Sequence, residues 1–177
     1  IKNIYDKTFT KLHILKFTMY KKILFMDADM IAIKSELFSL FNLNTPAGVF
    51  MGCGVPHSDV VTYKKNYCGI IKHGEKIPHN LYDTNCKYFK SKNNNSENNG
   101  SYLGIESSIM LLKPNIDDYN NLINILNKVK KPIRSDTELL SKYYIDKWYS
   151  IDIRFLGRWQ LPEIHPEIVT MDLYGFD

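Results

Sequence analysis

The chain has 177 residues, of which 44% are hydrophobic, and carries a formal net charge of +4. This length is enough for one domain with a real core, and the scattered basic residues argue against a nucleic-acid-binding surface, where such residues cluster. No apolar run is long enough to cross a bilayer, so we expect no membrane segment. A mild positive charge favours an anionic small molecule such as a nucleoside diphosphate.

The N-terminal stretch is polar and shows no signal-peptide pattern, and the chain starts at Ile1 without a Met. We therefore expect it to begin inside a longer protein. Its cysteines, Cys53, Cys68 and Cys86, form neither a metal-type pair nor an even disulfide set. This pattern favours a reducing compartment, and the expected location is the cytoplasm.

The first predicted elements are a helix and a strand. Residues 10–20 predict a helix with Thr10 as its N-cap, because apolar residues recur there at helical spacing: Leu12, Leu15 and Met19. The short apolar run Ile23–Met26 suits a strand buried on both faces of a parallel sheet. A helix followed by such a strand indicates the α/β class.

The next stretches predict a short helix or turn at Leu37–Leu43 and a second strand at Val49–Cys53. The polar, Asn- and Lys-rich stretch at about 72–101 predicts a long loop. No composition shift indicates a boundary, so we expect a single domain over residues 1–177, with this loop as an insertion.

Regular structure is predicted again after the loop. The run Ile109–Leu112 predicts a strand. A helix is expected at Asp117–Lys131, with one apolar face formed by Tyr119, Leu122, Ile123, Leu126 and Val129. Ser135 and Glu138 form a capping-box pattern, which predicts another helix through Tyr144.

Asp27 and Asp29 flank Ala28 directly after the first predicted strand. In an extended chain, side chains two positions apart point to the same side, so both carboxylates could face one ligand. Mg²⁺ and Mn²⁺ prefer oxygen ligands, typically carboxylates together with substrate phosphates. The alternative is that the two acids cap a turn or remain solvated.

The residues around this pair resemble the glycogenin-like family 8 glycosyltransferases. The resemblance rests on Thr10–His13, Tyr20 and Ile23–Met30, because a Lys-bearing helix precedes a strand ending in Asp-x-Asp in that family. It implies a GT-A fold, an α/β domain with a Rossmann-like mixed sheet flanked by helices, which binds a UDP-sugar with Mn²⁺ or Mg²⁺. By this resemblance, Asp27 and Asp29 are metal ligands, while Lys11 and Ala28 contact the nucleotide.

Two later segments extend the resemblance. Glu106, Ser107 and Ser108 stand where the family has Asn-Ser-Gly or Asn-Ala-Gly. The resemblance implies that both serines bind the donor and that Glu106 changes the contacts to the sugar. Asp136 followed by Thr137 matches the Asp of the family's Asp-Gln, which contacts the donor sugar. Glu106 and Asp136 are thus the candidate catalytic residues, although Asp136 also suits a helix start because it complements the dipole.

The ends of the family pattern are incomplete. The family's last motif contains a metal-binding His; here Asp172 stands at that place and is the candidate third metal ligand, with Gly175 in register. His165 is expected to be a loop residue. The family's first nucleotide-binding strand has no counterpart before Ile1. The resemblance therefore covers residues 2–175 and implies a piece of a family 8 domain lacking both ends.

Together these features predict a metal-dependent retaining glycosyltransferase that moves a hexose or related sugar from a UDP-sugar to an acceptor. The acceptor class, whether carbohydrate, polyol or protein, stays open. The loop at 72–101 is expected to help form or cover the acceptor site. We expect no nucleic-acid partner, and a homodimer is among the expected states.

Three other functions were considered. A degenerate protein of the same fold would bind nucleotide sugar or a partner without transfer, as the departures at Glu106, Ser108 and Thr137 suggest. An interaction module would use the aromatic segment at 143–159 as its contact surface. A phosphate-transfer enzyme acting through Asp27 would need a motif that this sequence lacks.

Overall fold

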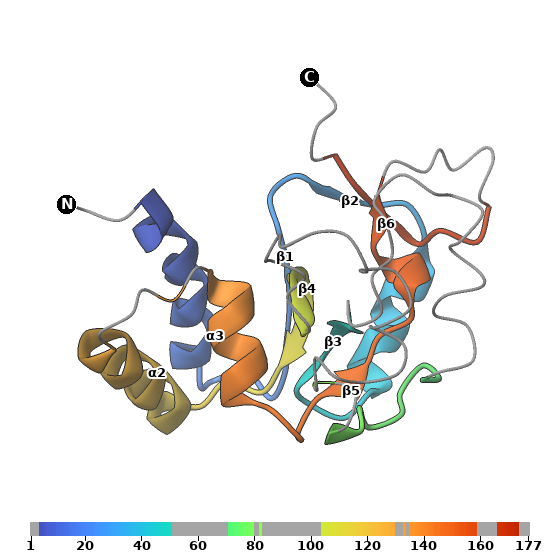
Figure 1. The fold of residues 1–177 in the computed structure, drawn as a ribbon. Coiled ribbons are helices and arrows are strands. Elements are labelled where there is room, and N and C mark those ends of the chain that lie inside the picture. Colours follow the sequence, from blue (N-terminus) through green and yellow to red (C-terminus); the bar gives the residue numbers. More distant parts are fainter. Residues whose placement is uncertain are drawn as a thin grey trace, which may run out of the picture.

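The computed structural model describes most of the chain, namely residues 4–50, 71–79, 82, 104–129, 133, 135–158 and 166–173 (Figure 1). Most of the predicted loop at 72–101, all three cysteines and His165 lie outside these residues. The elements are η1 (Ile4–Lys16), β1 (Ile23–Met26), β2 (Met30–Ala32), η2 (Ser35–Asn42), β3 (Ala47–Phe50), β4 (Ile105–Leu112), α2 (Ile116–Lys128), α3 (Asp136–Tyr143), β5 (Tyr149–Ser150), η5 (Ile153–Phe155), β6 (Gly157–Arg158) and β7 (Thr170–Asp172).

The strands form two mixed sheets. The larger has the order β1-β4-β3-β5, in which β4 pairs antiparallel with β1 and β3, while β3 and β5 are parallel. The smaller has the order β2-β7-β6, with β2 antiparallel and β6 parallel to β7. The predicted mixed sheet flanked by helices is therefore present.

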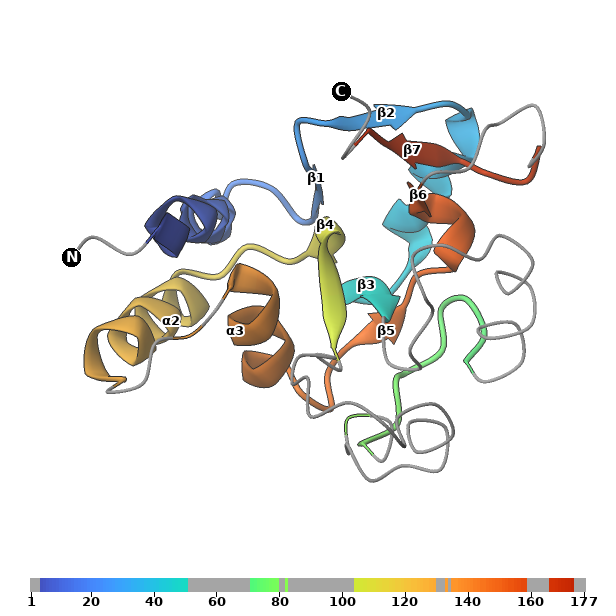
Figure 2. The same ribbon diagram turned by 45° about the horizontal axis from the view of Figure 1, so that its top comes forward.

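Strand β4 lies at the centre of the molecule and divides its core. Met110 and Leu112 pack against η1, α2 and α3, whereas Ile109 and Leu111 pack against η2 and η5. Figure 2 shows these helices and the smaller sheet on the two sides of β4. Because successive strand residues point to opposite faces, the apolar run Ile109–Leu112 of this strand is buried on both.

The two α-helices begin at the caps that their sequences supply. The Asn115 side chain accepts hydrogen bonds from the amides of Asp117 and Asp118, at 2.8 and 3.2 Å, and so starts α2. Ser135 Oγ accepts from the amide of Glu138 at 3.2 Å, which confirms the predicted cap of α3. Each cap satisfies amides that have no partner inside the helix.

The N-terminal helix differs from its prediction. η1 starts well before Thr10, whose hydroxyl donates to the Lys7 carbonyl at 2.7 Å, so Thr10 is not the N-cap. Leu12 and Leu15 are buried as expected, but Met19 lies beyond the end of the helix and is 75% exposed. A threonine hydroxyl that bonds back to the preceding turn fits a position inside a helix.

Strand β1 also differs from expectation. It runs antiparallel to β4 at the end of the larger sheet, and its residues are half-buried instead of buried on both faces of a parallel sheet. The prediction was wrong about its place because an apolar run indicates burial without specifying which strand lies alongside.

Close packing determines the path of β3 beside β4. The pairing shifts between Gly48 and Val49, and a Cβ on Gly48 would lie 2.2 Å from the Ile105 side chain. Only glycine allows this approach. Trp148 is fully buried in the same region, which argues against an interaction surface built around it. Among the described residues, every helix is too short or too polar to span a membrane.

Candidate active site

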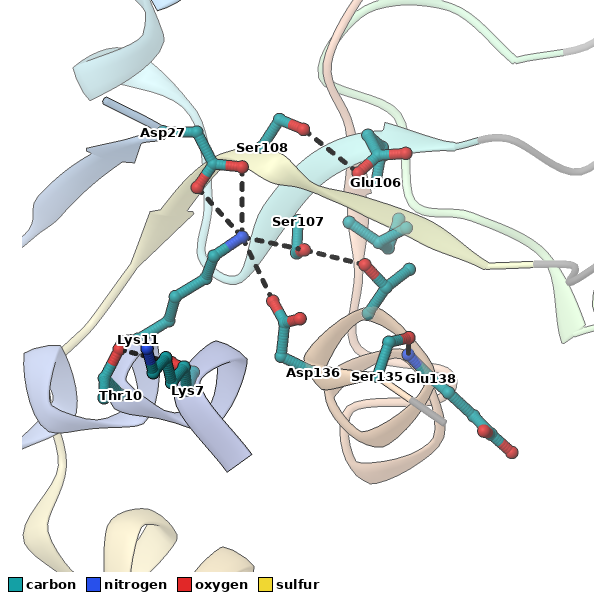
Figure 3. Close-up of polar contacts among 12 residues, drawn as sticks. Lys7, Thr10, Lys11, Asp27, Glu106, Ser107, Ser108, Ser135, Asp136 and Glu138 are labelled. Carbon is teal, nitrogen blue, oxygen red and sulfur yellow. Dashed lines mark hydrogen bonds and ion pairs between the residues drawn. The ribbon is translucent and has the colours of Figure 1, made fainter. Parts of the chain in front are cut away.

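Four side chains from separate elements meet beside the end of β1 (Figure 3). Lys11 comes from η1, Asp27 follows β1, Ser107 lies on β4 and Asp136 opens α3. The Asp27 amide donates to the Ser108 carbonyl at 2.8 Å, which extends the contact of β1 with β4 by one residue. The helices and strands of the core therefore hold these groups from several directions.

The ammonium of Lys11 is the centre of this cluster. Its Nζ lies 2.9 and 3.1 Å from the two carboxylate oxygens of Asp27, 3.2 Å from Asp136 Oδ2 and 3.3 Å from Ser107 Oγ. The contacts with Asp27 and Ser107 are hydrogen bonds, and the contact with Asp136 is an ion pair. The Asp136 side chain is only 5% exposed, and a buried carboxylate needs such a partner.

The cluster carries more negative than positive charge. Burial lowers the pKa of Lys11, but the hydrogen bond from its Nζ to Asp27 and the charges of Asp136 and Asp27 outweigh this, and the net pKa is raised. Burial raises the pKa of Asp27, the contact with Lys11 lowers it, and the charges of Asp29 and Asp136 raise it further. Lys11 therefore stays charged, while Asp27 sits in an environment with surplus negative charge.

Hydroxyl side chains lie beside this cluster. Ser107 Oγ lies 2.7 Å from Thr137 Oγ1, and Ser108 Oγ donates to Glu106 Oε1 at 3.1 Å. The sequence analysis treated Thr137 only as a departure from the family pattern. Its contact with Ser107 makes it part of the cluster, and its position directly after Asp136 was the signal that could have placed it there.

The acidic pair lies in a turn. The Met30 amide donates to the Asp27 carbonyl at 3.1 Å, so the chain reverses over these residues and the expected extended geometry is wrong. Ala28 and Asp29 are exposed at the turn. Asp29 is nevertheless close enough for its charge to raise the pKa of Asp27.

Asp172 lies on the strand that runs beside this turn. It is the register partner of Met30, and the Leu173 amide donates to the Asp29 carbonyl at 2.9 Å. Its side chain is buried, and Asp172 is only 3% exposed. The predicted third ligand thus belongs to the same neighbourhood as the acidic turn.

The donor chemistry fits a hard cation, although no three-ligand cage is preformed. Within the described ranges, no three His, Cys, Asp or Glu side chains gather closely enough to hold an ion. Mg²⁺-type ions are commonly bound through one or two carboxylates, with substrate phosphates and water completing the shell. Asp27 and Asp29, with their uncompensated charge, fit that kind of site.

Comparisons with known proteins give a family match, a relative and solved structures of similar fold. A profile of glycosyl transferase family 8 matches residues 1–161. An uncharacterized protein of Acanthamoeba polyphaga mimivirus is 27% identical in an alignment of 157 residues, which covers 85% of this chain and 44% of that relative. The chain therefore spans less than half the length of this curated relative.

Solved structures with the same fold include the glycosyltransferase GlyE of Streptococcus pneumoniae TIGR4 and its apo form. Each matches 96% of this chain with a TM-score of 0.55 and 14% identity, and the match covers 38% and 37% of the two neighbours. Together with the mixed sheet and its flanking helices, this likeness confirms the predicted GT-A fold.

Proposed function

Because the chain belongs to glycosyltransferase family 8, we propose that it forms the donor-binding part of a metal-dependent, retaining glycosyltransferase. The donor is a UDP-sugar carrying a hexose or a related sugar, and the acceptor is a carbohydrate, a polyol or a protein. Sequence reasoning assigned Lys11, Asp27, Ser107 and Asp136 to this site from separate segments. The observation that supports the proposal most is that the other three all contact the ammonium of Lys11.

In this proposal, Asp27 and Asp29 hold Mn²⁺ or Mg²⁺, with Asp172 nearby on β7 as the candidate third ligand. Such an ion would supply positive charge that offsets the negative charge developing on the leaving diphosphate. Lys11 donates hydrogen bonds to the diphosphate oxygens, and Ser107, Ser108 and the turn at Ala28 contact the nucleotide.

The sugar ring is oriented by carboxylates on two elements. Asp136, at the start of α3, and Glu106, on β4, accept hydrogen bonds from sugar hydroxyls. Asp136 contacts Lys11, which also binds Ser107, and Glu106 accepts a hydrogen bond from Ser108. Holding the ring against the diphosphate accelerates the reaction by orientation.

In the proposed route, retention results from attack on the face from which the diphosphate departs. The bond from the anomeric carbon to the diphosphate oxygen breaks, and its electron pair stays on the diphosphate. The acceptor hydroxyl oxygen bonds to the same face, and its proton passes to a departing diphosphate oxygen. Charge stabilisation by pre-positioned groups supplies most of the rate in such a reaction.

A UDP-release assay tests this function. Wild-type protein is assayed with Mn²⁺ or EDTA against UDP-glucose, UDP-galactose, UDP-N-acetylglucosamine and UDP-xylose. We expect Mn²⁺-dependent release with at least one donor and none from Asp27→Asn or Asp29→Asn. Asp117→Asn is the matched control, because Asp117 is an exposed acid on α2, beyond the other end of β4. Full activity in both site variants would refute the assignment.

A degenerate protein that binds nucleotide sugar without transfer is the second candidate. The observation that favours it is the hydrogen bond between Ser108 and Glu106, two residues that depart from the family pattern and engage each other in the site. Mn²⁺-dependent UDP-sugar binding without UDP release would select this alternative.

A further inference from the structure

We propose that Lys11 occupies the cation site as an internal counter-ion and that a divalent cation must compete with it for Asp27. This inference rests on the proposed function, since it concerns regulation of the same site. It begins from the geometry of one contact: the ammonium lies within 2.9 and 3.1 Å of both oxygens of the Asp27 carboxylate.

The contact leaves Asp27 without a carboxylate oxygen that is remote from the ammonium. A cation that approaches Asp27 must either share a carboxylate oxygen with the ammonium, beside its positive charge, or displace Lys11. Both arrangements weaken binding, because like charges at such distances repel strongly away from bulk water. Lys11 is 17% exposed and Asp27 is 27% exposed, so solvent screens this repulsion only in part.

Lys11 already holds several acceptors. Its Nζ donates hydrogen bonds to Asp27 and Ser107 and forms an ion pair with Asp136. An arriving diphosphate must compete with these acceptors for the ammonium. Of the two carboxylates, Asp27 is the more exposed to solvent: its side chain is 27% exposed and that of Asp136 is 5% exposed.

The two ligands are therefore coupled through one side chain. A diphosphate that draws the ammonium away from Asp27 frees that carboxylate for the cation, so each ligand strengthens binding of the other. Thermodynamic linkage makes this coupling reciprocal. The expected order is that the cation binds weakly alone and tightly once a nucleoside diphosphate is present.

The test measures Mn²⁺ affinity without nucleotide, by the electron paramagnetic resonance signal of the free ion. Lys11→Met and Lys11→Gln are compared with the wild type; Gln keeps a hydrogen-bond donor and guards against collapse of the site. Lys16→Met is the matched control, because Lys16 is an exposed lysine of the same helix whose Nζ lies over the Tyr119 ring. Circular dichroism verifies that each variant folds.

We expect both Lys11 variants to bind Mn²⁺ at least about fivefold more tightly than the wild type, within the usual range of coupling between two sites. Lys16→Met should bind as the wild type does. UDP should strengthen Mn²⁺ binding less in the Lys11 variants than in the wild type, because these variants lack the ammonium that competes for Asp27.

The outcomes separate this inference from the proposed function. Unchanged or weaker Mn²⁺ binding in both Lys11 variants, with wild-type binding that still depends on Asp27, would overturn the competition and leave the metal-dependent function standing. No Mn²⁺ binding by the wild type, with or without UDP, would overturn the proposed function and the inference with it.

Discussion

Carboxylates at the two ends of β4 are held in different ways. Beside its first half, Asp27 and Asp136 share one ammonium, that of Lys11. Beyond its last residues, Asp118 of α2 accepts hydrogen bonds from the hydroxyls of Tyr143 and Tyr144, at 2.7 and 3.0 Å.

The difference separates a structural site from one suited to ligands. Burial first, and then the charge of Asp118, raise the pKa of the Tyr144 hydroxyl far above its usual range, so this donor stays protonated. The neutral donors hold one carboxylate and tie α2 to α3. At the other end, two carboxylates and the nearby Asp29 exceed the single positive charge of Lys11, which leaves capacity for another cation.

The largest effect is expected from Asp136→Ala. Removing one partner of a buried ion pair typically costs about 3–5 kcal/mol, and we expect about 3 kcal/mol here because Lys11 keeps Asp27. UDP release should fall by about 10²-fold, the scale of loss when a group that orients the sugar ring is removed. Urea unfolding and the release assay measure the two effects. Wild-type values for both would contradict the role of Asp136.

Tyr144→Phe should act on stability alone. It removes one of two hydroxyl donors to Asp118, and a hydrogen bond to a charged group contributes about 1.5–3 kcal/mol. We expect a loss of about 1.5 kcal/mol in urea unfolding and unchanged UDP release at a temperature where the variant is folded. A parallel fall in release would break the distinction between the two ends of β4.

Two serines offer a matched pair within the same region. Ser141→Ala leaves the buried Ile105 amide without the hydroxyl that accepts its hydrogen bond at 2.8 Å, and an unsatisfied buried group costs about 1–3 kcal/mol. Ser107→Ala removes an acceptor of Lys11 and should alter UDP release more than stability. Equal profiles for the two variants, measured by the same assays, would show that Ser107 has only a structural role.

The smallest effect concerns acid stability near His73. Its Nδ1 accepts a hydrogen bond from the Asp152 amide at 3.0 Å, which requires the neutral ring. Burial lowers the pKa of His73; the charge of Asp152 opposes this shift and that of Arg154 adds to it. The unfolded chain therefore binds this proton more readily, and stability decreases as the pH falls below about 6.5. We expect His73→Gln to lose less stability than the wild type between pH 7 and pH 5, as measured by thermal unfolding. An equal loss in the two proteins would assign the acid sensitivity to other groups.

Local signals in the sequence predicted most elements but not their neighbours. The cap at Ser135 and the apolar face of α2 indicated both α-helices, because these features act within one turn. The place of β1 at the end of its sheet depends on which strand lies alongside, and the turn at Asp27 depends on a backbone hydrogen bond. An apolar pattern in the sequence indicates neither the neighbouring strand nor this hydrogen bond.

The candidate site shows the same limit. Its residue types could be predicted from the family resemblance, one segment at a time. The meeting of Lys11 with Ser107 could not, because it joins residues 96 positions apart whose contact depends on how η1 packs beside β4. The roles of all the predicted site residues, the contacting ones included, stay predictions.

The most direct measurement is anomalous X-ray scattering from crystals of the wild-type protein grown with Mn²⁺ and UDP. The account predicts a manganese peak at about 2.0–2.6 Å from the carboxylate oxygens of Asp27, the range of hard-cation contacts, bridging them to the diphosphate. UDP bound without manganese beside Asp27, or manganese bound only elsewhere, would contradict it.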